Sequence, residues 1–510
     1  MAELIARTDL TEGQRNFILR LGGEKLTEKA MLFLFKNKFK RAISRRTLRA
    51  ILGRLTDMPK DLVVSSVEDK KEQPVLTDKL NLNVDKMLIT CFVVGGEIDT
   101  YAYSELENYI NEGFSVFVIP LEGKRKTKFN QQELSSIKAD LPLLPNGARY
   151  LLDNDIRIER YNINILNLYG SRQSYTHLRH IKKHVIVPET SFTIYSTPTE
   201  LNSPPTYLFT TGCINKKSRL YSKNHLGYLQ EEQHKLGGIF IENGLVTQAT
   251  FKSKREFAEA LVVGDLHLPY ENKMFIRNLK KQLETHRPKK VFLHDLLDLA
   301  PFSHHTHKNV WAKLNKDNTT EHLKQIRDKI TGLIALCDNF GVEIYVVASN
   351  HDTHLMTGLM TQSLSKMNKE DATLYFQYGS LVLSENKKPL EAIFKVCGVS
   401  DSDINKLNFI DVKTGCESAG FTLNLHGDAG INGASFSSGG FKRIGAKAIV
   451  GHSHSCSRDG DVLTTGTSSK LLLGYNERGF SSWSDANVIV KKTDAYHEIL
   501  IGDAENENVA

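Results

Sequence analysis

The stretch Ala260-Leu261-Val262-Val263-Gly264-Asp265-Leu266-His267 joins a short apolar run to a carboxylate and an imidazole. Four consecutive apolar residues that end at a polar turn are typical of a buried strand. A helical stretch at 271–285 follows, and the apolar run 290–293 predicts the next strand. The alternation continues with a helix at 320–339 and a strand at 342–348. The second half of the chain therefore predicts a layered α/β core.

Four further segments place the same types of side chain next to apolar runs. They are His294-Asp295-Leu296-Leu297-Asp298, Ser349-Asn350-His351-Asp352, Leu425-His426-Gly427-Asp428 and Gly451-His452-Ser453-His454. Asp, Asn and His supply hard oxygen and borderline nitrogen ligands, enough for two divalent metals. Two metals about 3.5–4 Å apart can clamp an in-line attack on phosphorus. The ordered set predicts phosphoester hydrolysis, although each segment alone is a weak signal.

Length and composition predict several domains. A chain of 510 residues should hold two to four of them. In chain order we predict a basic helical domain at 1–60, a linker at 61–86 and a mixed α/β accessory domain at 87–254. The domain that carries the five segments is predicted at 255–505. The accessory domain has strand-like runs but no recognisable chemical motif.

Positive charge is concentrated near the N-terminus. Residues 1–55 contain 13 Lys and Arg against 5 Asp and Glu, whereas the net charge of the whole chain is +7. A basic helix after a turn, at 45–52, is compatible with a helix-turn-helix and with DNA as the partner. The alternative is a small helical domain with a solvated basic face, or one that packs against a neighbour.

The composition also bears on the cellular compartment. No apolar run reaches 18 residues, and the first residues lack the features of a signal peptide. The six cysteines have no CxxC spacing, so we expect neither a disulfide framework nor a structural zinc site. We therefore predict a cytoplasmic protein without a membrane segment.

The five segments, in this order, resemble the calcineurin-like metallophosphoesterase family. The pattern of that family is Asp-x-His, Gly-Asp-x-x-Asp, Gly-Asn-His-Asp/Glu, His and Gly-His-x-His, and the resemblance covers residues 258–505. It implies an α/β fold, a four-layer α/β/β/α sandwich with a dinuclear metal site between the sheet ends. A small N-terminal helical domain and a mixed α+β middle domain complete the predicted fold class.

The resemblance also implies metal ligands. Three residues would hold one metal ion: Asp265, His267 and His454. Three others would hold the second: Asn350, His426 and His452. Asp295 would bridge the two ions. Mixed carboxylate, imidazole and amide ligation suits Mn²⁺, with Fe²⁺ or Zn²⁺ as alternatives.

Two further residues receive catalytic roles from the resemblance. His351 would stand beside the metals as the acid that protonates the leaving oxygen, or as a contact to the phosphate. Asp298 would orient His351 or an imidazole that binds metal. The alternative role for Asp298 is to cap the N-terminus of a helix.

The sequence departs from the family pattern at two positions. His294 and Ser349 stand where the family usually has Gly, and neither replaces a ligand. His294 adds an imidazole near the metals. We predict substrate contacts at five positions: His294, His304, His305, Lys442 and Arg443. The alternative for residues 303–308 is an exposed polar loop.

A finer resemblance rests on the glycine-rich residues 427–443, on Gly466-Thr467-Ser468 and on Ser481-Ser482-Trp483. Together with the histidines at 294, 304 and 305 they are similar to metallophosphoesterases of large lytic phages. That group includes pre-early DNases related to SbcD-type nucleases. The resemblance implies a two-metal-dependent DNase, which in a phage would degrade host DNA in the host cytoplasm.

Two alternatives remain open at this point. A phosphatase or small-nucleotide phosphodiesterase would have the same site residues. A DNA-binding or assembly protein could keep the phosphoesterase fold as a vestige, although the full set of expected site residues argues against it. As partners we expect DNA and further copies of the chain in a homo-oligomer.

Overall fold

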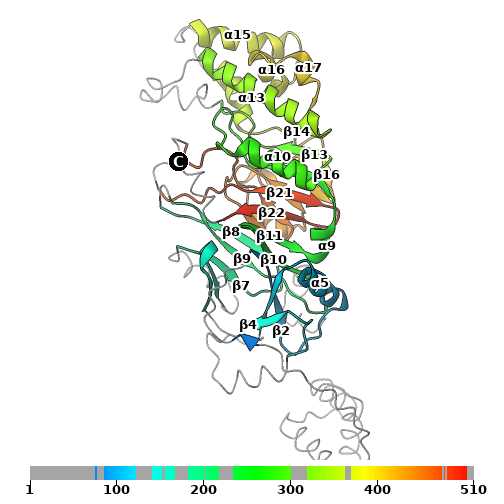
Figure 1. Ribbon diagram of the computed structural model, residues 1–510. Helices are drawn as coiled ribbons and strands as arrows, with labels where there is room; N and C mark the ends of the chain where they lie inside the picture. The colour runs from blue at the N-terminus through cyan, green and yellow to red at the C-terminus, as the bar shows by residue number, and fades with distance from the viewer. Residues whose placement is uncertain are drawn as a thin grey trace, which may run out of the picture. The chain divides into compact units, whose positions relative to one another are not determined.

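The computed structural model describes part of the chain, in these ranges: 75–76, 85–121, 141–151, 155–166, 182–200, 203–217, 234–299, 302, 319–361, 369–473, 476 and 479–501. The chain divides into two compact units, residues 1–72 and 73–510. The basic helical domain predicted at 1–60 lies outside the described residues, as does most of the predicted linker. All the elements below belong to the second unit (Figure 1).

Twelve strands form one mixed sheet. Their spatial order is β1 (Val75–Leu76), β4 (Arg149–Leu151), β3 (Ser115–Leu121), β2 (Lys86–Val93), β10 (Gly237–Glu242), β11 (Leu245–Thr250), β22 (Ala495–Leu500), β21 (Asn487–Lys491), β12 (Ala258–Val263), β13 (Lys290–Leu293), β14 (Glu343–Val347) and β15 (Leu407–Ile410). The strands from β12 to β15 run parallel to one another. The hairpin β21–β22 joins β12 to β11 by antiparallel pairing.

Ten strands form a second mixed sheet. Their spatial order is β16 (Glu417–Ser418), β17 (Phe421–Thr422), β18 (Ala448–Val450), β20 (Val462–Thr464), β19 (Ser457–Asp459), β8 (Thr193–Thr197), β9 (Thr206–Thr210), β7 (His184–Val187), β6 (Ile163–Leu166) and β5 (Asp155–Ile158). The protein is therefore a mixed α/β structure with two large mixed sheets, as the predicted fold class requires at that level.

Residues 87–254 and 255–505 share both sheets. In the first sheet, β11 pairs with β22, and in the second, β8 pairs with β19. The boundary predicted between residues 254 and 255 thus falls inside one compact unit. Arg458 of β19 strengthens this junction, because its guanidinium donates to Gln248 O at 3.3 Å and to Ala495 O at 2.9 Å.

The strand β12 shows how alternate side chains fill two layers. Leu261 and Val263 belong to a core cluster that also contains buried residues of the helices. Ala260 and Val262 belong to another cluster, together with Ile449 and residues of the second sheet. Successive side chains of a strand point to opposite faces. One face of the first sheet therefore packs on helices and the other on the second sheet.

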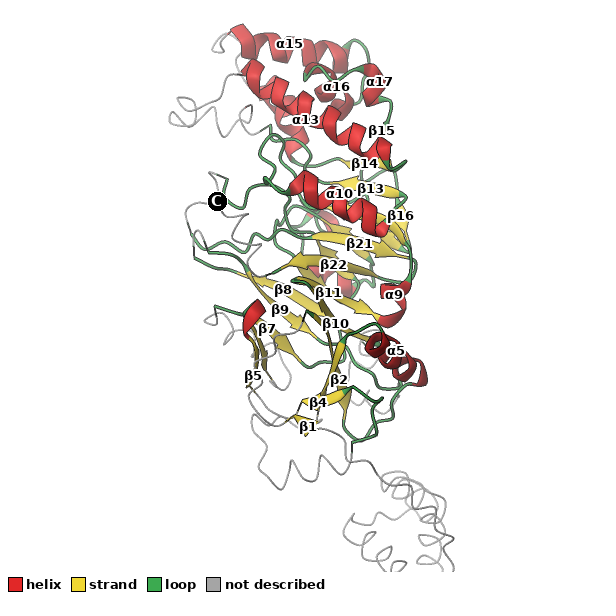
Figure 2. Ribbon diagram, in the orientation of Figure 1, coloured by secondary structure: helices red, strands yellow, loops and turns green. Residues whose placement is uncertain are grey.

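The helices of the described chain are α5 (Thr100–Asn111), α9 (Phe251–Arg255), α10 (Phe275–His286), α13 (Thr319–Asn339), α14 (His354–Thr361), α15 (Lys369–Leu383), α16 (Pro389–Val396), α17 (Asp401–Ile404) and α18 (Ser438–Arg443), with 3-10 turns η3 (Glu159–Tyr161), η6 (His351–Thr353) and η8 (Ile431–Gly433). Figure 2 shows α13, α15, α16 and α17 gathered at the end of the unit beyond β14. Among the described helices, none is both long and apolar enough to cross a membrane.

Local sequence explains two helices that pack on the first sheet. In α13, buried residues recur at Ile326, Ile330, Leu333 and Cys337, which is the spacing of one helical face. α10 buries Leu279 and Leu283 in the same core cluster. On the outer face of the second sheet, the short α18 packs Phe441 against residues of β18 and β20.

Candidate metal centre

Three parallel strands end side by side and carry the first three motifs. Asp265, Asp295 and Asn350 follow the last residues of β12, β13 and β14 within three positions. These strands pair in parallel register, so their C-terminal ends lie at one edge of the sheet. That edge is the usual ligand site of α/β sheets. Residues far apart in the sequence are therefore brought together by the register alone.

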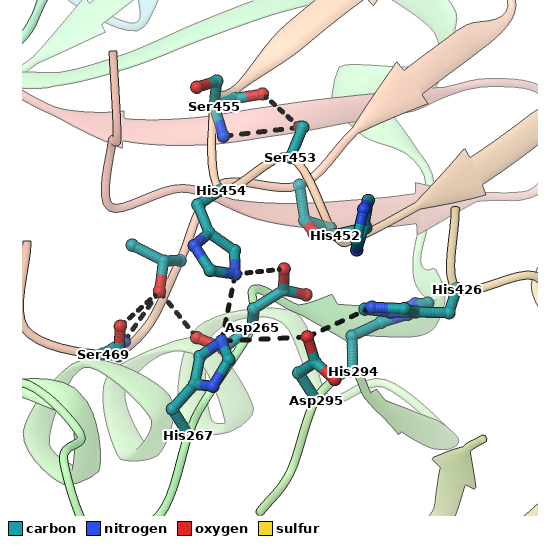
Figure 3. A network of polar contacts seen from close by, with 12 residues as sticks. Asp265, His267, His294, Asp295, His426, His452, Ser453, His454, Ser455 and Ser469 are labelled. Atoms are coloured by element: carbon teal, nitrogen blue, oxygen red, sulfur yellow. Dashed lines mark hydrogen bonds and ion pairs between the residues drawn. The ribbon is translucent and has the colours of Figure 1, made fainter. Parts of the chain in front are cut away.

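The second sheet supplies the other two motifs. β18 ends at Val450, and the next residues are Gly451 and His452. Gly451 N donates to His426 O at 2.7 Å, which ties the fourth motif to the fifth. Figure 3 shows the imidazoles of His267 and His454, one from each sheet, pointing toward each other beside Asp265.

One donor group consists of four buried residues whose ligand atoms all lie within 4.8 Å of one another: Asp265, His267, Asp295 and His454. His454 Nε2 lies 3.0 Å from Asp265 Oδ2 and 2.9 Å from His267 Nε2. His267 Nε2 lies 3.7 Å from Asp295 Oδ2. Two imidazoles and two carboxylates that converge in this way could hold a divalent metal ion.

A second donor group contains Asp295 again, with His426 and His452. His426 Nε2 lies 3.1 Å from Asp295 Oδ2. His452 Nδ1 lies 3.2 Å from Asn350 Oδ1, so the amide of the third motif adjoins this group. The same oxygen of Asp295 thus faces an imidazole of each group.

The carboxylates of the centre have no hydrogen-bond partners in the described structure. Both side-chain oxygens of Asp265 and of Asp295 are buried without one, and so is Nε2 of His426. The imidazoles approach these oxygens closely but without hydrogen-bond geometry. A buried polar atom without a partner costs about 1–3 kcal/mol, and a charged one more. A cation bound by these carboxylates would offset that cost, so the donor set fits a metal ion.

Four of the candidate ligands have left-handed backbone conformations. The φ angles are 50° at His267, 36° at Asp295, 66° at His452 and 53° at His454. Such conformations in residues other than Gly cost on the order of 1–3 kcal/mol and concentrate at functional sites. The rest of the fold therefore stabilises four unfavourable backbone conformations, and in these conformations the four side chains converge.

The glycine of the fifth motif makes room for a ligand. A Cβ atom on Gly451 would lie 2.2 Å from Asp265 Oδ1 and 3.0 Å from His294 Cβ. No side chain larger than hydrogen fits there without displacing the Asp265 carboxylate. Gly264 is equally confined, because its Cβ would lie 2.6 Å from Gly466 O.

Residues that the sequence did not single out as functional fix the backbone of Asp265. Thr467 Oγ1 donates to Asp265 O at 2.7 Å, and Ser468 N donates to the same oxygen at 2.8 Å. Asn487 Oδ1 accepts a hydrogen bond from Gly264 N at 2.9 Å. The stretch 466–468 was notable only for its finer resemblance, and Asn487 gave no signal because it lies 223 residues from Gly264.

Electrostatics keep Asp295 ionised and His267 neutral, which are the forms that bind metal, but they hold His426 protonated near neutral pH, so a metal ion at His426 would displace a proton. Burial opposes the ionised form of Asp295, but the nearby imidazoles of His426 and His267 hold its pKa well below the usual range. Burial disfavours the charged form of His426, yet Asp295 and Asp265 raise its pKa to about 9. Burial lowers the pKa of His267 to about 4. Ionised carboxylates and neutral imidazoles are the ligating forms.

His294 lies inside the donor cluster. It has no exposed surface, and its Nδ1 is 3.5 Å from Nδ1 of His426. Its imidazole also forms a third donor group with Asp265 and His426. The predicted extra imidazole near the ligands is therefore present, whereas its predicted contact with a substrate stays a prediction.

The residues predicted to be catalytic lie next to the donors. His351 is half-buried, and its ring centroid is 4.8 Å from that of His267. Nδ1 of His351 is buried and has no hydrogen-bond partner. Asp298 is buried near His267, and its backbone oxygen contacts Nε2 of His322 at 3.0 Å.

Of the four remaining residues predicted to contact substrate, the structure describes two. Lys442 is half-buried and forms an ion pair with Asp459, while Arg443 is exposed. His304 and His305 lie outside the described residues.

Comparison with known proteins gives one distant relative of phage origin. The chain is 30% identical over 213 residues to the protein named "Protein A1" of Escherichia phage T5. The match covers 40% of this chain and only 37% of the length of that relative. No family model matches the chain. No solved structure matches it either.

Proposed function

We propose that the protein is a phosphodiester hydrolase that uses two adjacent divalent cations and acts on DNA. The observation that carries the proposal is the position of Asp295. Its Oδ2 lies 3.7 Å from His267 Nε2 in one donor group and 3.1 Å from His426 Nε2 in the other. A carboxylate shared in this way, with no hydrogen bond to either oxygen, is suited to bridge two cations.

The other donors divide between the two places. Three would hold one cation with Asp295: Asp265, His267 and His454. Three would hold the other with Asp295: Asn350, His426 and His452. A metal pair, when bound, supplies Lewis acidity, an activated nucleophile and a clamp for in-line displacement at phosphorus. The mixed oxygen and nitrogen donor set favours Mn²⁺, with Fe²⁺ or Zn²⁺ as alternatives.

His351 is the residue we propose as the proton donor. It adjoins His267 without belonging to a donor group of the described residues. A half-buried imidazole at this place can give a proton from a ring nitrogen to the oxygen that leaves phosphorus. Asp298 would support this region by holding the imidazole of His267 through its charge.

The fold supports the same proposal. Helices, two stacked sheets and α18 on the outer face follow one another in the order expected for a four-layer metallophosphoesterase sandwich. The donors lie where strands of both sheets end. DNA as the substrate is supported by the basic composition of residues 1–55 and by the exposed Arg443.

The test uses the purified full chain with Mn²⁺. We expect the protein to degrade DNA and EDTA to abolish this activity. A comparison of linear with circular DNA as substrates distinguishes exonuclease from endonuclease action. The generic diester bis(p-nitrophenyl) phosphate is assayed in parallel. Rapid hydrolysis of this ester beside intact DNA would refute a DNase and favour the phosphatase or small-nucleotide phosphodiesterase. A protein that binds no Mn²⁺, Fe²⁺ or Zn²⁺ would favour the vestigial DNA-binding or assembly protein.

A further inference from the structure

An aromatic side chain stands directly beside the candidate metal centre. The ring centroids of Trp483 and His454 are 4.1 Å apart, and their planes are nearly perpendicular at 82°. His454 is buried, whereas Trp483 is partly exposed. The indole therefore connects a candidate ligand to the surface of the protein.

The segment that carries Trp483 is fixed on three sides. Ser484 N donates to His454 O at 3.0 Å, which ties the segment to the ligand itself. Ser481 exchanges two backbone hydrogen bonds with Thr199, at 2.9 and 3.1 Å. The hydroxyl of Ser482 contacts that of Ser455 at 2.7 Å. These contacts hold the backbone on both sides of Trp483 close to His454.

A second aromatic residue begins the same segment. Phe480 is 75% exposed, which is unusual for so large an apolar side chain. It precedes Trp483 by three residues, and serines occupy the positions between and after them. An indole beside a centre that would bind phosphate suggests a ligand with both a phosphate and a flat ring.

We propose that Trp483 stacks on the base of the nucleotide whose phosphate lies at the metal centre. The substrate class is then a nucleotide phosphodiester. This inference rests on the proposed function, because it places the phosphate at the donor groups. Stacking on an aromatic side chain tolerates every base, since each base has a π-face. Trp483 would therefore recognise nucleic acid without selecting a sequence.

The alternative is that Trp483 only supports the structure around His454. The indole could simply hold the imidazole of His454 in place, and its loss would then disturb metal binding and every ligand alike. The two roles differ in a measurable way. A base-stacking residue affects ligands with a base more than ligands without one.

The experiment is calorimetric titration of the full chain loaded with Mn²⁺. The ligands are thymidine 5′-monophosphate, thymidine 3′-monophosphate and methyl phosphate. All three are phosphate monoesters, but only the two nucleotides carry a base. The variants are Trp483→Ala and Trp483→Phe, with Phe257→Ala as the matched control. Phe257 is 89% exposed and lies before β12, at the end of that strand opposite the donors. Manganese affinity is measured for each variant in a separate titration.

We expect Trp483→Ala to weaken at least one thymidine monophosphate by roughly 5- to 150-fold relative to methyl phosphate. Trp483→Phe should recover most of that loss, and Phe257→Ala should bind like the unmodified chain. An equal change for all three ligands, or a loss that follows manganese affinity, would overturn the inference and leave Trp483 as a support for His454. So would an unmodified chain that binds thymidine monophosphates no more tightly than methyl phosphate. Absence of DNA hydrolysis would refute the proposed function but would leave these binding results interpretable.

Discussion

Two regions of the protein bury charged side chains, and they neutralise those charges differently. The guanidinium of Arg458 has no exposed surface and donates to both oxygens of Asp494, at 2.9 and 3.1 Å. Asp265 and Asp295 are equally buried, but their side-chain oxygens accept no hydrogen bond. In the first region, the buried guanidinium is neutralised and hydrogen-bonded by protein atoms alone. In the second region, carboxylates without hydrogen-bond partners lie beside imidazoles, and this set could hold a metal ion; this difference distinguishes a stabilising ion pair from a candidate binding site.

The largest effect is expected from Asp295→Asn, which removes the shared carboxylate. Manganese affinity should fall by more than about 100-fold, because even residues that only support a ligand cost 10- to 100-fold when changed. Hydrolysis should be lost with it. The metal-free protein should unfold at a lower temperature, because the amide leaves the protonated imidazole of His426 buried without its carboxylate. Calorimetric titration and thermal melts check both points, and normal turnover at saturating Mn²⁺ would refute the bridging role.

His351→Ala separates catalysis from metal binding. We expect the rate of phosphodiester hydrolysis to fall by about 10²- to 10⁴-fold, the usual contribution of a general acid, while the metal content is unchanged. Elemental analysis and steady-state kinetics measure the two quantities. His354→Ala is the control, because its ring lies 5.0 Å from that of His351 on the same segment. A rate that does not change in His351→Ala would remove this residue from the mechanism.

Asp494→Ala tests the buried ion pair between Arg458 and Asp494. It leaves the guanidinium of Arg458 buried without a carboxylate, which should lower the free energy of unfolding by about 3–5 kcal/mol. Chemical denaturation measures this loss. Asp401→Ala is the control, because Asp401 pairs with Lys395 at the surface and its side chain is 74% exposed. Similar stabilities of these two variants would show that burial of Arg458 does not matter to the fold.

The stability gained on Mn²⁺ binding also distinguishes the candidate metal centre from the buried ion pair. A ligand that binds only the folded state at 100 times its dissociation constant adds about 2.7 kcal/mol of stability. We expect this gain in the unmodified chain and in Asp494→Ala, but not in Asp295→Asn. Thermal melts with and without EDTA provide the measurement. An equal gain in Asp295→Asn would place the metal elsewhere.

The smallest effect is expected from Arg443→Ala. If the exposed guanidinium contacts a phosphate of DNA, the slope of log affinity against log salt should decrease by about 1. Fluorescence anisotropy at several salt concentrations measures the slope. The control is Lys280→Ala, on the exposed side of α10. The same slope for both variants would assign Arg443 to ordinary surface.

Much of the local structure could be predicted from the sequence. The strand expected at 290–293 is β13 at Lys290–Leu293, and the helix expected at 320–339 is α13 at Thr319–Asn339. Continuous apolar runs and helical spacing are local signals, so they can be recognised without tertiary information. The cluster of Asp265, Asp295 and their histidine neighbours was also expected, although from a family resemblance and not from periodicity.

The pairing of distant strands could not be predicted. Nothing in the sequence of β8 indicates that Ile194 pairs with Arg458 of β19, because the register depends on contacts between remote segments. The same holds for β11 and β22, which join residues 87–254 to the sheet of the donor motifs. Trp483 was noted only as part of a resemblance, since its proximity to His454 depends on how the segment 481–484 is anchored.

The place of the hairpin β21–β22 in the first sheet has a consequence for biosynthesis. These are the last two strands of the described chain, yet they lie between β11 and β12 in the middle of the sheet. During translation, the strands on either side of the hairpin are synthesised first, and they become one sheet only after residues 487–500 have left the ribosome. Asn487, which positions the backbone next to Asp265, arrives with the same hairpin. A chain without this hairpin would thus lack an assembled centre, so metal binding at the candidate centre would depend on the last strands to be synthesised in the described chain.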